Sequence, residues 1–389
     1  MEFDFTEEQK LIVETARKVG ENFGPAYWRE IDSEKEFPRK FWDAVCEAGL
    51  AATMVPEEYG GSGLGMQEMS MIVETLAAAG GGATIGQLFM IGPIFGGLAI
   101  QRFGTPEMKK DLLPKIAQGM IVSMALTEPN AGSNSLQITT FATREGNGWK
   151  LNGRKIWITG IDNAEKCLVV ARTAKPGELP KKTDGLSLFI IDVKRKGVDF
   201  SPIDKCGTNT LSSNNVFFDD VQIDGSELLG EVNKGWSHLL DVLNSERICA
   251  TAALCGAGEL AIKLGVSYAN DRVVFDNKPI SSYQGLQFPL AQAFVEIESA
   301  RLMNYKAAWL FDHNRPHGSE ANIAKLISAR GAELAADRAM QMMGGMGYAK
   351  DSYVERLWRD SRLFRIAPVS EEMIYNFVAM QNLGMPRSY

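Results

Sequence analysis

The amino-acid sequence predicts an α+β protein in which a β-rich segment separates two helical segments. Apolar residues recur at three- and four-residue spacing before about residue 120 and again after about residue 231, which is typical of helices with one buried face. Between about 121 and 225 the chain changes to short runs rich in β-branched and aromatic residues, which are typical of strands. We therefore expect an N-terminal helical domain over 1–120, a central β domain over 121–230 and a C-terminal helical bundle over 231–389. The β domain is expected to be barrel-like or a pair of packed sheets.

The first segment contains clear helix signals. Thr6 and Gln9 have the spacing of a capping box, so a helix is expected to begin directly after Thr6. Pro106 follows a threonine, and proline is favoured in the first turn of a helix because its missing N–H has no partner there anyway. The apolar stretch 82–100 is long enough to raise the question of a membrane span. Its glycines and its proline favour a buried helix pair instead.

The β-rich segment contains two Asn-Gly pairs between its apolar runs. Asn147-Gly148 and Asn152-Gly153 are both typical of hairpin turns, because the two residue types tolerate positive φ. Trp157 and Thr159 lie two positions apart in one predicted strand, so their side chains are expected on the same face.

Composition and charge exclude several classes of protein. A net charge of −7 provides no basic stripe for phosphates, which argues against nucleic-acid binding. The five cysteines are scattered without a CxxC pair, which indicates free thiols in a reducing compartment. The first residues show neither a secretory nor an Arg-rich transit pattern, so we expect a cytoplasmic protein without a membrane span. The three histidines are too far apart in the sequence to predict a metal site.

The string ALTEPNAGSNS, residues 125–135, is the first candidate for a functional site. It places the hydroxyls of Thr127 and Ser133 in a turn after a strand, and such a turn exposes backbone N–H groups to an anion or a ring carbonyl. A turn without any ligand fits this string equally well. Trp157 and Thr159 in NGRKIWITG favour a ligand, because an aromatic side chain next to a hydroxyl suits a flat conjugated ring with a polar edge.

Together with PEEYGG, YANDRVVF, QMMGGMGY and VERLWRDSRL, these two strings occur in an order and spacing that resemble the acyl-CoA dehydrogenases over nearly the whole chain. The resemblance implies an N-terminal helical domain, a β domain and a C-terminal four-helix bundle. It also implies a homotetramer that holds FAD, takes an acyl-CoA substrate and passes electrons to an electron-transferring flavoprotein.

The resemblance assigns cofactor contacts by position. It implies that Leu126 and Thr127 meet the flavin ring, that Trp157 and Thr159 flank it, and that Ser133 lies where FAD and the CoA arm approach. Ser370 and Glu372 fall where the C-terminal loop contacts FAD. A second set is implied to reach FAD from a neighbouring subunit: Arg272, Phe275, Gln284, Gln341, Gly344 and Gly345.

The expected catalytic base is displaced in this chain. The family reaction removes an α proton from an acyl-CoA thioester while the β hydride moves to flavin N5, and many members use a glutamate where this chain has Pro368. Glu246 in LNSERI resembles the base of the isovaleryl- and long-chain branches, with Asn244 and Arg247 on the substrate side. Pro368 also lacks the N–H that polarises the thioester carbonyl, a role that the N–H of Val369 is placed to take.

Three other functions remain open at this stage. The chain lacks the C-terminal glutamate, as does the crotonobetainyl-CoA reductase branch, so a flavin-dependent enoyl-CoA reductase is one alternative. A desulfinase-like or oxidase-like relative of the same fold is another. The third is a non-catalytic subunit that binds FAD or a CoA ester. Pro368 favours this alternative, whereas the presence of Glu246 argues against it.

Overall fold

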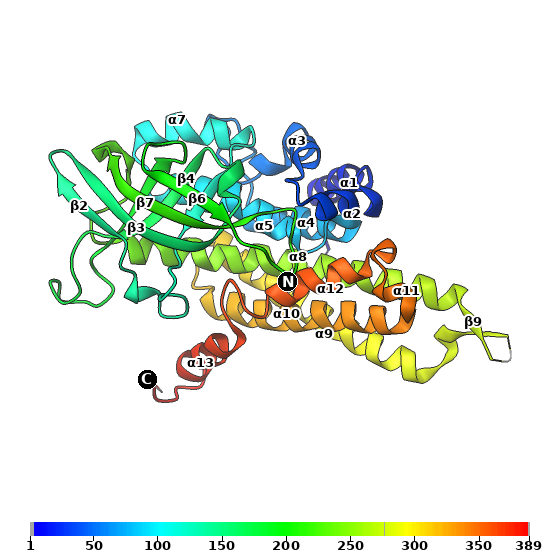
Figure 1. Ribbon diagram of the computed structural model, residues 1–389. Coiled ribbons are helices and arrows are strands. Elements are labelled where there is room, and N and C mark those ends of the chain that lie inside the picture. The colour runs from blue at the N-terminus through cyan, green and yellow to red at the C-terminus, as the bar shows by residue number, and fades with distance from the viewer. Residues whose placement is uncertain (1–3, 276, 388–389) are drawn as a thin grey trace.

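The computed structural model of the chain describes residues 4–275 and 277–387. A β domain lies at one end of the molecule and a bundle of long helices extends from beneath it to the other end (Figure 1). The N-terminal helices pack on the same bundle. One continuous hydrophobic core includes buried residues from all three parts of the chain. The predicted α+β class is therefore confirmed, with helical N- and C-terminal domains around a central sheet domain.

The N-terminal part is helical as predicted. Its helices are α1 (Glu7–Glu21), α2 (Pro25–Glu34), α3 (Arg39–Glu47), α4 (Met66–Leu76), α5 (Thr84–Phe89), α6 (Ala99–Phe103) and α7 (Pro106–Ala117). Two 3₁₀ turns, η1 (Leu50–Ala52) and η2 (Glu57–Tyr59), and two π-helical segments, η3 (Ala77–Gly81) and η4 (Met90–Leu98), lie between them. The capping box of Thr6 and Gln9 is formed at the start of α1, and Pro106 occupies the first turn of α7.

The apolar stretch in this part is one helical run and not the pair of helices that we predicted. α5, η4 and α6 follow one another without a break, and Pro93 lies inside η4. Two helices are long and apolar enough to span a membrane, Thr84–Phe103 and Gly235–Asp271, but 94% and 78% of their most apolar windows are buried inside the protein. Both are core helices of a soluble fold.

The β domain forms a mixed eight-stranded sheet with the order β6-β7-β3-β2-β4-β5-β8, and β1 pairs with β4. Its strands are β1 (Val122–Ala125), β2 (Phe141–Glu145), β3 (Gly148–Thr159), β4 (Lys166–Arg172), β5 (Leu186–Asp192), β6 (Val198–Pro202), β7 (Ser213–Ile223) and β8 (Leu228–Leu229). Short 3₁₀ turns connect them: η5 (Ser135–Gln137), η6 (Ile161–Asn163) and η7 (Gly225–Glu227). β6 and β8 were not among the predicted strands: β8 has only two residues, and β6 ends in Pro202.

One of the two predicted Asn-Gly turns is wrong. Asn152 and Gly153 lie inside β3, where the register with β7 shifts between Leu151 and Gly153. A Cβ on Gly153 would lie 2.4 Å from the Thr140 hydroxyl oxygen, so glycine serves a close approach of two chain segments there and not a turn. In the first pair Asn147 lies in the turn between β2 and β3 and Gly148 begins β3, although Gly146 is the residue with positive φ (57°).

The helical bundle begins with the 37-residue helix α8 (Gly235–Asp271). It continues with α9 (Gln284–Asp312), α10 (Gly318–Met343), α11 (Gly345–Tyr348), α12 (Val354–Leu363) and α13 (Glu371–Gln381). The small hairpin β9 (Val273–Val274) and β10 (Lys278–Pro279) joins α8 to α9 through η8 (Ile280–Ser282), and η9 (Lys350–Ser352) precedes α12. This hairpin and α11 lie at the end of the bundle that is far from the β domain, whereas α13 projects from its side (Figure 1).

Candidate active site

The chain segment after β1 lies directly beside the middle of β3. The N–H of Ile156 donates to the carbonyl of Thr127 at 3.0 Å, and the Thr127 hydroxyl donates back to the Ile156 carbonyl at 2.5 Å. Thr127 therefore lies next to Trp157, although 30 positions separate them in the sequence. The structure thus brings together the four side chains that we predicted at the flavin ring: Leu126, Thr127, Trp157 and Thr159.

Trp157 is presented to solvent by an irregularity in β3. The register with β7 shifts between Lys155 and Ile158, and Trp157 itself has a φ of 63°, in the left-handed region. Its side chain is 55% exposed, which is unusual for a tryptophan in a sheet. The simple alternation that we used to place Trp157 and Thr159 on one face is therefore broken at Trp157. A non-glycine residue in this conformation is typical of functional sites.

A buried ion pair holds the segment after β1 from below. The ammonium group of Lys155 donates to the Leu126 carbonyl at 2.8 Å and to a Glu128 carboxylate oxygen at 3.0 Å. The same carboxylate accepts hydrogen bonds from the N–H groups of Thr139 and Thr140. Burial alone would raise the pKa of Glu128, but Lys155 and the hydrogen bonds lower it to about 2. The sequence did not predict this pair, because neither the residues around Glu128 nor those around Lys155 indicate that the two side chains meet.

Glu246 lies in the first half of α8 with a side chain that is only 7% exposed. Burial raises the pKa of its carboxyl group to about 7, while Arg247 and Lys325 act in the opposite direction. No hydrogen bond to this carboxylate is found in the described parts of the chain. A carboxyl group that titrates near neutral pH and is not held by a partner is suited to accept a proton from a substrate.

The neighbours of Glu246 on α8 are polar on one side and closely packed on the other. Arg247 donates to the side-chain oxygen of Asn244 at 2.5 Å, and no hydrogen-bond partner of its buried Nε is found among the residues that the structure describes. Burial lowers the pKa of Arg247. On the other side the Cys249 thiol donates to the Gly86 carbonyl at 3.5 Å. A Cβ on Gly86 would lie 2.9 Å from Ala253, so the glycine lets α5 approach α8 next to the site.

The C-terminal loop supplies a second carboxylate, but that group is already paired. Hydrogen bonds from Arg365 and Arg330 hold Glu371, and they lower its pKa to about 2 although burial would raise it. Ser370 caps α13 by accepting the N–H of Met373 at 3.4 Å. Pro368 follows a cis peptide bond, and its position offers no carboxylate. Glu371 is therefore less available to accept a proton than the Glu246 carboxyl group.

The remaining predicted contacts lie in two other places. Ser133 occupies an exposed turn that continues from the segment after β1, and Glu372 is exposed at the start of α13. The second set gathers at the far end of the bundle: Arg272, Phe275, Gln284, Gln341, Gly344 and Gly345, all exposed. Because α8 is continuous from Glu246 to Asp271, a rise of 1.5 Å per residue puts this set about 38 Å from Glu246. One chain therefore does not bring the two sets together.

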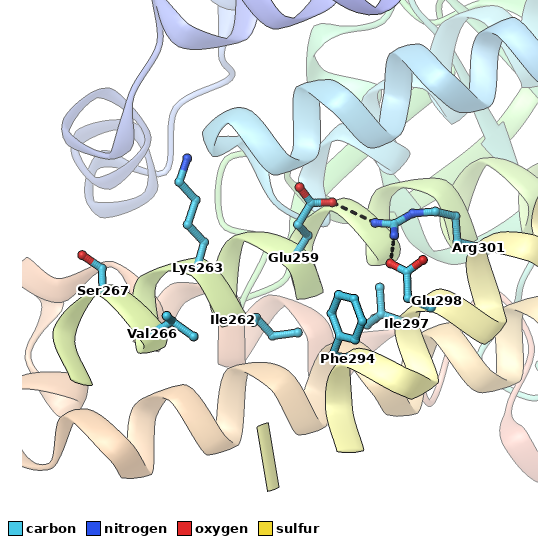
Figure 2. A pocket seen from close by; sticks show the side chains of 9 residues that line it. All are labelled: Glu259, Ile262, Lys263, Val266, Ser267, Phe294, Ile297, Glu298 and Arg301. Carbon is cyan, nitrogen blue, oxygen red and sulfur yellow. Dashed lines mark hydrogen bonds and ion pairs between the residues drawn. The ribbon is translucent and has the colours of Figure 1, made fainter. Parts of the chain in front are cut away.

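A cavity of about 660 Å³ lies between α8 and α9, away from Glu246. Figure 2 shows its apolar floor, which includes Ile262, Phe294 and Ile297, and a charged end where Arg301 bonds to Glu259 and Glu298. Glu259 is 13 residues beyond Glu246 on α8, which is about 20 Å along the helix. The cavity is therefore separate from the candidate base.

A metal centre is not found among residues 4–275 and 277–387, where no three His, Cys, Asp or Glu side chains are close enough to hold an ion. His238 instead stacks on Phe103 with ring centroids 4.3 Å apart.

The fold and the site define a flavin-dependent oxidoreductase that acts on CH–CH bonds.

Comparison with known proteins identifies the family. Models of the N-terminal, middle and C-terminal domains of acyl-CoA dehydrogenase match residues 6–120, 123–221 and 233–383. Acyl-CoA dehydrogenase FadE12 of Mycobacterium tuberculosis is 39% identical over 99% of this chain and 98% of its own length. The 3-(aryl)acrylate reductase of Clostridium sporogenes is 34% identical over 97% of this chain and 99% of its own. Butyryl-CoA dehydrogenase of Megasphaera elsdenii has a TM-score of 0.92 at 29% identity, covering 98% of this chain and 100% of that structure. The chain belongs to the acyl-CoA dehydrogenase family, whose members are FAD-containing flavoproteins.

Proposed function

We propose that the protein is an acyl-CoA dehydrogenase in which Glu246 removes the α proton of the thioester. The single observation that carries this proposal is the buried, unpaired Glu246 carboxyl group, whose pKa is raised to about 7. A base with a pKa near the working pH combines a high deprotonated fraction with a strong pull on the proton. Asn244 and Arg247 lie beside it, and we assign them to the substrate side.

The residues around Trp157 fit a flavin. An exposed indole next to the partly exposed Leu126, Thr127 and Thr159 offers a flat apolar surface with hydroxyl groups at its edge. FAD, when bound, would accept the hydride that leaves the β carbon of the substrate. We assign Ser133, Ser370 and Glu372 to its remaining contacts within the same chain. The work of the protein in this step is to hold the substrate between Glu246 and this surface and to exclude water.

We assign polarisation of the thioester carbonyl to the N–H of Val369. Pro368 has no N–H, and no hydrogen bond from the Val369 N–H is found within the described part of the chain. The Val369 carbonyl is fixed by Lys325, so the loop at this residue is held in place. A backbone donor aimed at the developing enolate oxygen contributes about 3 kcal/mol to the stabilisation of the transition state.

We infer that the active protein is a homotetramer. The second set of predicted cofactor residues lies about 38 Å from Glu246 along α8, so a second copy must supply them if they contact the same FAD. Exposed apolar side chains on α8 and α9, such as Val266, Phe294 and Leu302, provide a surface for such copies. The cavity in Figure 2 lies on this surface.

We further place this enzyme in the cytoplasm, divide it into domains near residues 120 and 230, and assign its electrons to an electron-transferring flavoprotein. These assignments are supported by the family and by the soluble fold.

A second candidate function is the reverse reaction, reduction of an enoyl-CoA or a related acrylate. Pro368 in place of a glutamate favours it, as does the likeness to the 3-(aryl)acrylate reductase of Clostridium sporogenes. In that direction Glu246, protonated at its raised pKa, donates the proton to the α carbon. The same buried carboxyl group argues against the desulfinase-like relative and the non-catalytic subunit, because neither needs it.

The deciding experiment is anaerobic mixing of the purified holoenzyme with straight, branched, cyclic and aromatic acyl-CoA thioesters, followed by the absorbance of the flavin. We expect rapid bleaching with one class of thioester and a loss of at least about 100-fold in rate for Glu246→Gln. The control is Asp241→Asn, which changes a carboxylate of the same helix that is paired with Arg102.

The outcomes separate the candidates. Bleaching that survives in Glu246→Gln refutes the assignment of the base. The reductase is supported by two results together. The oxidised flavin is not bleached by any saturated thioester, and chemically reduced flavin is reoxidised when an enoyl-CoA or an acrylate is added. A flavin that responds to neither leaves only the non-catalytic binder.

A further inference from the structure

Lys325 of α10 is a buried lysine whose effect on the Glu246 carboxylate the mechanism above does not use. Its side chain is fully buried, at 0% exposed, and its ammonium group donates a hydrogen bond to the main-chain carbonyl of Val369. Burial of an ammonium group costs several kcal/mol unless charges and acceptors nearby compensate for it. The position of Lys325 relative to Glu246 and to the C-terminal loop therefore decides which groups compensate for its buried charge.

The register between α8 and α10 locates Lys325. Three close approaches, each between residues 74 positions apart, show that the two helices run parallel: Asn244 with Gly318, Gly258 with Ala332, and Gly265 with Ala339. The same offset places Lys325 opposite Thr251. Thr251 lies five residues beyond Glu246, about 7.5 Å along the helix. Because helical side chains tilt toward the N-terminus, the lysine stem points back toward the level of Glu246.

The charged groups around Lys325 come from two elements, α8 and α13. Glu246 and Arg247 face it from α8, and Glu371 and Glu372 face it from the start of α13. Burial and Arg247 lower the pKa of Lys325 to about 8, while the carboxylates act in the opposite direction, so the group is mainly protonated at pH 7.

Of these carboxylates, Glu371 is already held by two arginines and Glu372 is exposed, whereas Glu246 is buried. The other titratable neighbour of Glu246 on α8 is the Cys249 thiol, whose pKa is raised by burial and by Glu246, so it stays neutral.

We propose that Lys325 is a positioning residue for Glu246, which keeps the base ionised near neutral pH and fixes the Pro368–Val369 loop beside it. The proposal rests on the assignment of Glu246 as the base. One ammonium group serves both purposes because it donates to the loop carbonyl and lies close enough to the α8 carboxylate to act on its charge. An opposite charge near a carboxylate favours the ionised form, and the fixed loop carbonyl keeps the ammonium group in place.

The test is the pH dependence of flavin reduction in a single turnover with saturating acyl-CoA, measured from pH 5.5 to 9. We compare wild type with Lys325→Gln, which removes the charge, and Lys325→Arg, which keeps it. Loss of a cation raises the pKa of the base, so the acid limb should move to higher pH by about one unit in Lys325→Gln. At pH 6 the rate of Lys325→Gln, expressed as a fraction of its own plateau, should then be about tenfold lower than that of wild type, whereas near pH 9 the two profiles should converge. Lys325→Arg should keep the wild-type limb.

Lys306→Met, a change of an exposed lysine of α9, is the control for removal of a positive charge elsewhere in the bundle. A merely structural role of Lys325 would lower the rate equally at all pH values, so an unmoved acid limb in Lys325→Gln overturns the proposal. A shift of equal size in Lys325→Arg also overturns it, because the charge is then irrelevant. Glu246→Gln, measured in parallel, distinguishes failure of the Lys325 proposal from failure of the base assignment. If the flavin of Glu246→Gln bleaches normally, the assignment of Glu246 as the base has failed.

Discussion

The raised pKa of Glu246 has a consequence for stability that does not depend on turnover. A buried carboxyl group that titrates near pH 7 in the folded protein, against 4.5 in the unfolded chain, binds its proton more tightly when folded. Its contribution to stability is therefore fully present below pH 4.5 and is lost as the pH rises through about 7. Glu246→Gln has no proton to lose, so its stability lacks this component of the pH dependence.

The size of the effect follows from the two pKa values. Integration of the difference in bound protons gives about 1.4 kcal/mol lost by pH 5.5 and about 3.3 kcal/mol by pH 8. Between these two pH values wild type should lose about 2 kcal/mol relative to Glu246→Gln. Any constant cost of burying the amide cancels in this comparison, as do the contributions of FAD and of subunit association at matched concentrations.

The assay is urea unfolding of both holoproteins at pH 5.5 and pH 8, followed by tryptophan fluorescence. Asp241→Asn is again the control, since its carboxylate is about half exposed and paired with Arg102. A difference between wild type and Glu246→Gln that is the same at both pH values would refute the reasoning, because Glu246 would then titrate as an ordinary exposed glutamate. A difference that grows in favour of wild type at pH 8 would mean that the folded protein stabilises the ionised form.

Three further predictions concern the β domain. Lys155→Met should lower the free energy of unfolding by about 3 kcal/mol, because it leaves the buried Glu128 without its cation. Thermal unfolding measures this loss. The double variant Glu128→Gln/Lys155→Met should lose less stability, since it leaves no unpaired charge. Trp157→Ala should weaken FAD binding about tenfold, measured by titration of the apoprotein, whereas Phe200→Ala, a change of another exposed aromatic residue of the sheet, should leave it unchanged. Gly153→Ala should cost about 1–3 kcal/mol because its methyl group would meet Thr140, while Gly285→Ala, where a Cβ has open space, should cost little; equal losses would contradict the role of Gly153.

Local signals in the sequence were sufficient where the structure depends on neighbouring residues. The capping box at Thr6 and Gln9 and the first-turn Pro106 are formed as predicted, because a cap depends only on residues three or four positions apart. The order of helical and β-rich segments was also predictable, since the periodicity of apolar residues follows from the repeat of each element.

The same local signals failed where distant segments decide the conformation. Asn152-Gly153 has the composition of a hairpin turn, yet β3 continues through it because β7 and the segment at Thr140 pack against it. The predicted helix pair is one helical run, and Gly86 within it permits close packing against Ala253 of α8.

The sequence by itself determined the family, the fold class and the identities of the candidate residues, including Glu246 as the candidate base. Only the tertiary structure decided their environments. It buried Glu246 so that its pKa approaches neutrality, paired Glu371 with arginines, and placed Lys325 where both carboxylates act on its charge. It also separated the two sets of predicted cofactor contacts along α8. The physical reason is that burial and charge depend on which segments meet in space, and a sequence motif specifies residue types but not their neighbours.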